Sequence, residues 1–129
     1  MNTLILITFI STLLPFLAKI PVALAMHRKG GYDNRHPRQQ QSQLTGFGAR
    51  ALAAHQNSFE ALIIFGVAMA TAMATNTTNE VVIYLGVTHL VARVLYCVLY
   101  WFDINIIRSI VWGIGTVASF AIIWQCLSF

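Results

Sequence analysis

Four long apolar runs, separated by polar segments, make up most of this chain. They cover roughly Asn2–Met26, Phe47–Thr75, Val81–Trp101 and Ile106–Leu127. An α-helix needs about 20 apolar residues to cross the hydrocarbon core of a bilayer, and each run meets that length. The pattern therefore predicts four transmembrane helices.

The polar segments differ in charge, and this difference predicts the topology. The loop from His27 to Gly46 is the one long polar connection, with Gly, Asn and Pro at spacings that favour turns. Its four cations are Arg28, Lys29, Arg35 and Arg38, whereas the connection Asn76–Glu80 has no Lys or Arg. Because Lys and Arg accumulate in cytoplasmic loops, we expect the first loop in the cytoplasm and both termini on the opposite side.

The composition agrees with a membrane protein. The 129 residues are 57% hydrophobic and 9% charged, with a mean hydropathy of +0.69, whereas soluble domains average about 25% charged residues. The length suits one all-α bundle that forms a single domain over residues 1–129. The first run is not expected to be a cleavable signal, because it lacks a positively charged start and a small-residue cleavage pattern.

The sequence offers little support for binding of a nucleic acid or a metal ion. The net charge of +4 is concentrated in one polar loop, which topology explains without a nucleic-acid partner. Cys97 and Cys126 lie in apolar runs without a CxxC spacing and are expected to be buried hydrophobic residues. The histidines lack the spacing of metal ligands, so no metal site is predicted.

Polar side chains form stripes on two of the predicted helices. With about 100° per residue, Arg50, Asn57 and Glu60 fall within a sector of roughly 80°. The stripe on the next helix steps by four, three and four residues and consists of His89, Arg93, Tyr96 and Tyr100. Arg108 opens the last helix on the same side of the membrane. These stripes share a depth and are expected to converge on a small ligand that carries carboxylates and amides.

Simpler interpretations exist for each of these residues. Glu60 alone would be explained by an ion pair with Arg93 or Arg50, since charges inside a membrane must find partners. The two tyrosines would be explained by an interfacial aromatic belt, and Arg108 by anchoring at the cytoplasmic face. His89 is expected to be a hydrogen-bonded core residue, and His55 suits helix packing as well as ligand contact.

Three motifs resemble one family. They are Arg50-x4-His55-x-Asn57-x2-Glu60, Ala92-Arg93-x2-Tyr96-x3-Tyr100 and Ile107-Arg108-Ser109. Together with the four-helix layout, they resemble the membrane-associated proteins in eicosanoid and glutathione metabolism, the MAPEG family. This family includes microsomal glutathione transferases and leukotriene and prostaglandin synthases. The segments 31–38 and 53–60 look like its bacterial branch.

The resemblance implies a homotrimer of four-helix subunits with glutathione, as cosubstrate, bound between neighbours near the cytoplasmic side. Arg108 corresponds to the arginine that stabilises the glutathione thiolate, which would make it the catalytic residue. At the position of a glutathione-contacting arginine in the eicosanoid synthases this chain has Ala53, and Arg50, one turn earlier, is the alternative contact. The binding residues implied are Arg28, Lys29, Arg50, His55, Asn57, Glu60, Arg93, Tyr96 and Tyr100.

The resemblance therefore predicts a glutathione-dependent transferase or peroxidase that acts on hydrophobic electrophiles dissolved in the membrane. Its partners would be other copies of the chain, membrane lipids and a hydrophobic small molecule, in an integral protein of the bacterial inner membrane. The alternative is a non-catalytic lipid-binding or scaffold protein of the same fold, in which the polar stripes serve assembly. A transporter is disfavoured, because the sequence has no internal repeat.

Overall fold

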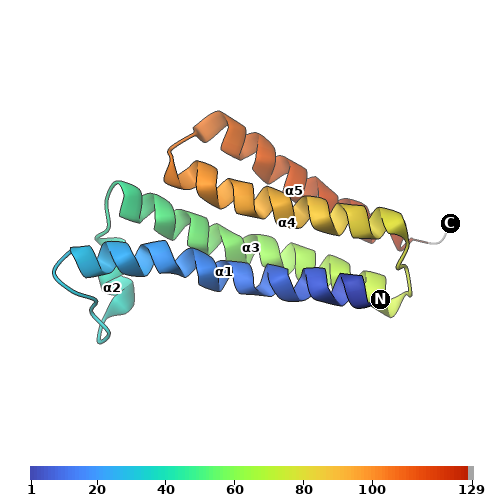
Figure 1. Ribbon diagram of the computed structural model, residues 1–129, viewed down its shortest axis with the longest axis horizontal. Helices are drawn as coiled ribbons and strands as arrows, with labels where there is room; N and C mark the ends of the chain where they lie inside the picture. The colour runs from blue at the N-terminus through green and yellow to red at the C-terminus, as the bar shows by residue number, and fades with distance from the viewer. Residues whose placement is uncertain (128–129) are drawn as a thin grey trace.

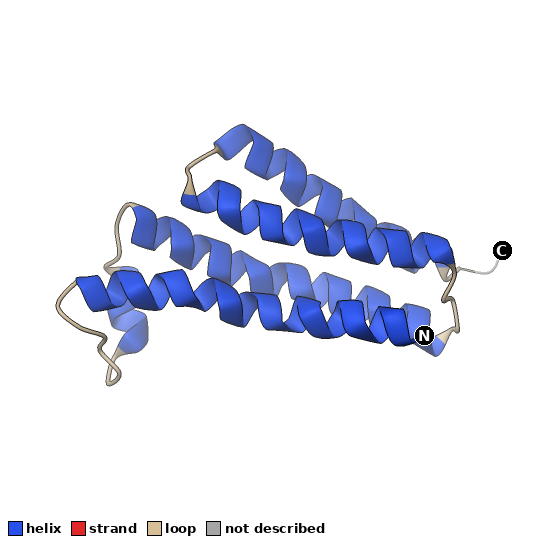
Figure 2. Cartoon of the chain, viewed as in Figure 1, coloured by secondary structure: helices blue, strands red, loops and turns tan. Residues whose placement is uncertain are grey.

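The structure, a computed structural model that describes residues 1–127, is helical with no strand over that range (Figure 2). Four long helices and one short one follow in order: α1 (Asn2–Arg28), α2 (Pro37–Ser42), α3 (Phe47–Ala74), α4 (Glu80–Trp101) and α5 (Asn105–Gln125). The four long helices are each long and apolar enough to cross a membrane. The prediction of an all-α bundle of four transmembrane helices is therefore confirmed.

The long helices form two antiparallel pairs, α1 with α3 and α4 with α5 (Figure 1). Helices α3 and α4 each pack against all three other long helices, whereas α1 and α5 do not contact each other within the described residues. The segment 29–46 and the α4–α5 connection lie at one end, here called the loop end. The α3–α4 connection, the start of α1 and the end of α5 lie at the other end.

Small residues let the helices approach closely. Ala51, Ala54 and Ala72 of α3 are completely buried, and a Cβ added at Gly115 of α5 would lie 3.3 Å from the Cβ of Ala92 on α4. Small residues at such interfaces allow backbone contact in a bilayer, where burial of apolar surface gives no driving force between helices. Packing of this kind therefore accounts for the close α4–α5 pair.

The outer surface is suited to lipid. Large apolar side chains such as Phe16, Ile63, Val117 and Trp124 are exposed on the outsides of the long helices. An exposed apolar surface of this extent is unfavourable in water and favourable in a bilayer. The chain is thus an integral, multi-pass membrane protein whose helices contact lipid.

Charge is distributed unequally between the two ends. All eight Lys and Arg residues lie in the loop-end half of the bundle: Lys19, Arg28, Lys29, Arg35, Arg38, Arg50, Arg93 and Arg108. Helix α3, with 28 residues, is about 42 Å long, which exceeds the roughly 30 Å of a hydrocarbon core. Its loop-end turns extend past the end of α4 (Figure 1).

A tight turn connects α4 to α5. The amide N–H of Ile104 donates to the carbonyl of Leu99 at 2.9 Å, and that of Asp103 donates to Tyr100 at 3.2 Å. Asp103 has φ of 60°, a left-handed conformation that Asp tolerates better than most residues. This pair of hydrogen bonds closes the end of α4 and fixes where α5, and with it Arg108, begins.

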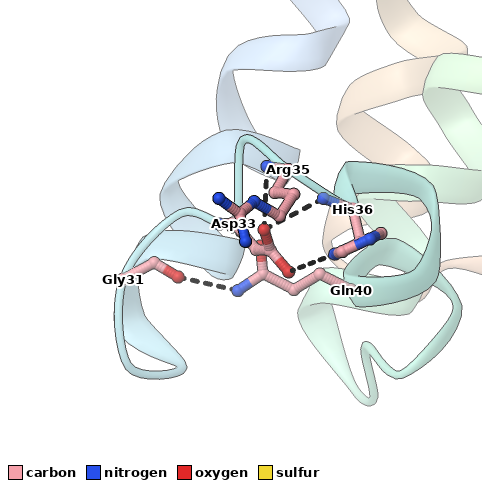
Figure 3. A network of polar contacts seen from close by, with 5 residues as sticks. All are labelled: Gly31, Asp33, Arg35, His36 and Gln40. Carbon is pink, nitrogen blue, oxygen red and sulfur yellow. Dashed lines mark hydrogen bonds and ion pairs between the residues drawn. The ribbon is translucent and has the colours of Figure 1, made fainter.

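The first loop contains the short helix α2, which the sequence pattern did not predict. Pro37 stands at its first position, where the missing N–H costs nothing. The Asp33 carboxylate accepts hydrogen bonds from the backbone N–H groups of Arg35 and His36, each at 2.9 Å. The Gln40 amide donates to the Gly31 carbonyl at 2.7 Å and accepts from the Asp33 N–H at 2.9 Å (Figure 3). The loop is therefore ordered by its own side chains.

Candidate ligand site between α3, α4 and α5

A buried arginine connects α4 to α3. Arg93 is 3% exposed, and its Nη2 donates a 2.8 Å hydrogen bond to Oδ1 of Asn57. Asn57 in turn donates from Nδ2 to Oε2 of Glu60 at 2.8 Å. The Asn57 amide thus links a guanidinium to a carboxylate, and these two hydrogen bonds fix its orientation.

Two tyrosines extend this chain of polar groups toward α5. The guanidinium carbon of Arg93 lies 4.2 Å from the ring centroid of Tyr96. The Tyr96 and Tyr100 rings meet edge to face with centroids 5.5 Å apart. The guanidinium carbon of Arg108 lies 4.1 Å from the ring centroid of Tyr100. Both arginines therefore rest on aromatic faces, where cation–π attraction holds them.

Within one chain, Glu60 does not form the ion pair with Arg93 or Arg50 that would explain it most simply. The only ion pair within 4.0 Å among residues 1–127 joins His36 to Asp33 in the loop. Glu60 reaches Arg93 through Asn57 instead, and the Glu60 side chain is exposed on the outside of the single chain. The tyrosines also differ from simple belt residues, since Tyr96 is 6% exposed and both rings support arginines.

The site has free hydrogen-bonding capacity. The Nε atom of Arg93 is buried and has no hydrogen-bond partner among the described residues. A buried donor without an acceptor is costly, so such atoms in native proteins call for a water, a ligand or a partner chain. Glu60 lies near the middle of α3, at a depth where an uncovered carboxylate is unfavourable.

Arg50 lies at the loop end of this face, away from Asn57. Its Nη2 donates to the backbone carbonyl of Trp101, the last residue of α4, at 3.3 Å. Cations stabilise the C-terminal end of a helix, whose last carbonyls lack partners. The Arg50 Nε and the Trp101 indole N–H are buried without partners in the described part of the chain. Arg50 therefore connects α3 to the end of α4.

Three residues implied by the resemblance lie outside this group within one chain. Nδ1 of His55 is 2.8 Å from the Pro15 carbonyl of α1, because His55 points to the side of α3 opposite Asn57. Lys29 donates from Nζ to the Gln43 carbonyl at 2.9 Å in the loop. Arg28, at the end of α1, is exposed.

His89 is a hydrogen-bonded core residue, as predicted from the sequence. It is 3% exposed, and its Nδ1 lies 2.9 Å from the Ser119 hydroxyl and 3.0 Å from the Gly115 carbonyl. Its ring stacks on Phe65 with centroids 3.9 Å apart. This cluster links α3, α4 and α5 beneath the ligand site. Ser119 and Phe65 gave no distinctive signal in the sequence, because each lies in an apolar run.

The arrangement suits recognition of an organic anion. Two guanidinium groups, an exposed carboxylate and a tyrosine pair form one row of contacts across three helices, and guanidinium groups match carboxylates in geometry and charge. No group of three or more His, Cys, Asp or Glu in residues 1–127 is placed to hold a metal ion.

The fold and this cluster define a class: a small four-helix integral membrane protein with an arginine- and tyrosine-rich polar site between helices. The sequence matches the model of the MAPEG family over residues 3–128. The chain therefore belongs to the MAPEG family. No curated protein and no solved structure matches it significantly.

Proposed function

We propose that the protein is a glutathione-dependent transferase or peroxidase that acts on hydrophobic electrophiles, with Arg108 stabilising the glutathione thiolate. The observation that carries this proposal is the continuous row of groups from Glu60 through Asn57 and Arg93 to the tyrosines and Arg108. Membership in the MAPEG family, which is associated with glutathione-using proteins, supports it.

The chemistry of glutathione fits these groups. The tripeptide carries two carboxylates, an ammonium group, two amide bonds and a thiol. The buried Nε of Arg93 is a free donor for a carboxylate oxygen. The exposed Glu60 carboxylate has capacity to accept from an ammonium group. The site therefore offers partners for both charge types of this ligand.

Arg108 is the residue proposed to activate sulfur. A thiol with a pKa of about 8.5 is mostly protonated at neutral pH, and lowering that pKa by two requires about 2.7 kcal/mol of differential stabilisation. The Arg108 guanidinium, fixed on Tyr100 near the start of α5, is suited to supply it.

The proposed transfer reaction consumes only glutathione and the electrophile. The thiol proton goes to solvent, and the thiolate forms a C–S bond with the electrophilic carbon while the leaving group departs with its electron pair. In a peroxidase reaction, two thiols are oxidised to a disulfide while a hydroperoxide is reduced to an alcohol and water.

A homotrimer is part of the proposal. The exposed Glu60 carboxylate at membrane depth favours a neighbouring subunit that covers this face. His55, Arg28 and Lys29 do not reach the Arg93 group within one chain, so their proposed contacts are with glutathione bound at a neighbour. The concentration of cations at the loop end favours a cytoplasmic loop, as in a bacterial inner-membrane protein, with the electrophile arriving from lipid.

Titration of glutathione into detergent-purified protein tests the proposal. We expect saturable binding and a thiolate absorbance near neutral pH that is lost in Arg108→Ala. Arg35→Ala, which removes an exposed loop arginine, should retain both. Intact trimers without saturable binding would overturn the proposal. A thiolate signal that survives Arg108→Ala would move the activating role to Arg93 or Arg50.

The scaffold alternative makes a different prediction for the same face. If the polar row serves assembly alone, Glu60→Gln should disrupt the oligomer. If it serves glutathione, the variant should remain assembled and bind glutathione more weakly. Size-exclusion chromatography combined with the titration separates these two results.

A further inference from the structure

A polar cavity lies at the loop end, between α1, α2 and α3 and apart from the Arg93 site. Its volume is about 560 Å³, within the range of small-molecule sites. We call it the loop pocket. The residues that matter for its chemistry are Lys19 of α1, Tyr32 of the loop, Arg38 and Gln41 of α2, and Phe59 of α3.

The loop pocket is distinct from the Arg93 site within one chain. His55, a lining residue of the pocket, and Asn57 are two positions apart on α3, which places them about 160° apart around the helix axis. His55 contacts the Pro15 carbonyl of α1, whereas Asn57 contacts Arg93 of α4. The two sites thus occupy opposite sides of α3.

The charged residues that line the loop pocket are all positive. Lys19 and Arg38 both line it, and none of its described lining residues is Asp or Glu. Tyr32, Gln41 and Ser42 add hydroxyl and amide donors. Two cations without a carboxylate, surrounded by donors, match a phosphate group.

The wall of the loop pocket opposite α3 is held in place. The Asp33 carboxylate holds residues 33–36 in a turn, and the Gln40 amide ties Gly31 and Asp33 to α2 (Figure 3). Gln40 also donates to the Met26 carbonyl of α1 at 3.3 Å. The loop therefore presents Tyr32 and Arg38 from a fixed backbone.

An apolar track leaves the pocket toward the centre of the membrane. Phe59 lines the pocket and meets Phe16 edge to face, with ring centroids 5.6 Å apart. Phe16 lies almost one turn nearer the middle of α1 than Lys19 and is 64% exposed on the outside of the single chain. A ligand with a phosphate at one end and a hydrocarbon chain at the other would satisfy both parts.

We propose that the loop pocket binds an anionic phospholipid, with the headgroup phosphate between Lys19 and Arg38 and an acyl chain along Phe59 and Phe16. Basic pockets at one membrane face are suited to anionic headgroups. The apolar track is the feature that favours a lipid over free phosphate. The proposal does not depend on glutathione binding at the Arg93 site.

Native mass spectrometry of the delipidated protein tests it, with phosphatidylglycerol or phosphatidylcholine added at equal concentration. We expect retention of phosphatidylglycerol and about tenfold weaker binding in Lys19→Gln and in Arg38→Gln, the effect of losing one charge-assisted hydrogen bond. Arg35→Gln removes the same charge from the same loop without touching the pocket and should bind like the unmodified chain. Arg38 is exposed, so its variant should fold.

Four results would overturn the proposal. Equal retention of the two lipids would show no selection for negative charge, and equal loss in Arg35→Gln would show a diffuse charge effect. Stabilisation of the protein against heat by inorganic phosphate as strongly as by phosphatidylglycerol would leave a simple anion site. Loss of glutathione binding in Lys19→Gln or Arg38→Gln, with lipid binding unchanged, would assign the pocket to glutathione. Failure of glutathione binding alone would leave the lipid site intact.

Discussion

Arg93 and Glu60 are linked without touching, because the amide of Asn57 lies between them and hydrogen-bonds to each at 2.8 Å. The guanidinium is buried and the carboxylate is exposed. The asparagine therefore connects the interior of one chain to its surface.

Replacing Asn57 should destabilise the bundle. Asn57→Ala would remove the acceptor of the buried Arg93 Nη2, and we expect a loss of about 2 kcal/mol in the free energy of unfolding. Thermal unfolding in detergent measures this loss. Asn34→Ala, at an exposed loop position, is the control. Equal stability of the two variants would show that Arg93 finds another acceptor.

We expect the aromatic ring of Tyr100, and not its hydroxyl, to support formation of the glutathione thiolate. Tyr100→Phe keeps the face on which Arg108 rests, whereas Tyr100→Leu removes about 1 kcal/mol of cation–π attraction. We expect a roughly fivefold lower thiolate signal from bound glutathione in Tyr100→Leu, and near-normal signal in Tyr100→Phe. The reverse order would point to a hydrogen bond from the hydroxyl.

Two glycines of α5 offer a matched test of helix packing. A Cβ at Gly115 would meet the Ala92 Cβ at 3.3 Å, whereas one at Gly113 has nothing within 4 Å. Gly115→Ala should therefore separate α4 from α5 slightly and lower stability by about 1 kcal/mol. Gly113→Ala should be neutral or stabilise by up to about 1 kcal/mol, since alanine favours helix. Destabilisation by Gly113→Ala in detergent unfolding would indicate a subunit contact there.

The loop should lose order in acid. The backbone N–H of His36, together with that of Arg35, holds the pKa of Asp33 below its usual value. A lowered pKa in the folded state means that the carboxylate stabilises the loop fully above the unfolded value of about 3.9. This contribution is lost as pH falls through the lowered pKa. The protection factors of residues 31–42 in hydrogen exchange, which are corrected for the intrinsic pH dependence of amide exchange, should therefore fall below about pH 4. In Asp33→Asn they should be low at neutral pH as well. Protection factors in the unmodified chain that stay constant through the protonation of Asp33 would contradict this.

The fold was largely predictable because its signals are local. Four apolar runs of transmembrane length and the uneven distribution of Lys and Arg define the four helices. Helix α2 was missed, since six polar residues have no periodic pattern. Its order depends on Gln40, whose partners at Gly31 and Met26 lie nine and 14 residues away.

The convergence at the site was partly predictable. Helical spacing placed Asn57 and Glu60 on one stripe and Arg93, Tyr96 and Tyr100 on another, and the structure brings the two stripes together. Spacing also places His55 on the opposite side of α3. The contact of Arg50 with Trp101 was not predictable, because it depends on how far α3 extends past the end of α4.

The absence of contact between α1 and α5 within the described residues has a consequence for biogenesis. Each antiparallel pair is a hairpin, and the α1–α3 hairpin is synthesised first. The α4–α5 hairpin must then enter the bilayer with Arg93 still lacking Asn57, and a buried arginine opposes insertion by about 2.5 kcal/mol or more. Insertion of the second hairpin is thus coupled to its docking on α3. The first hairpin must therefore be in the bilayer before Arg93 can find its acceptor.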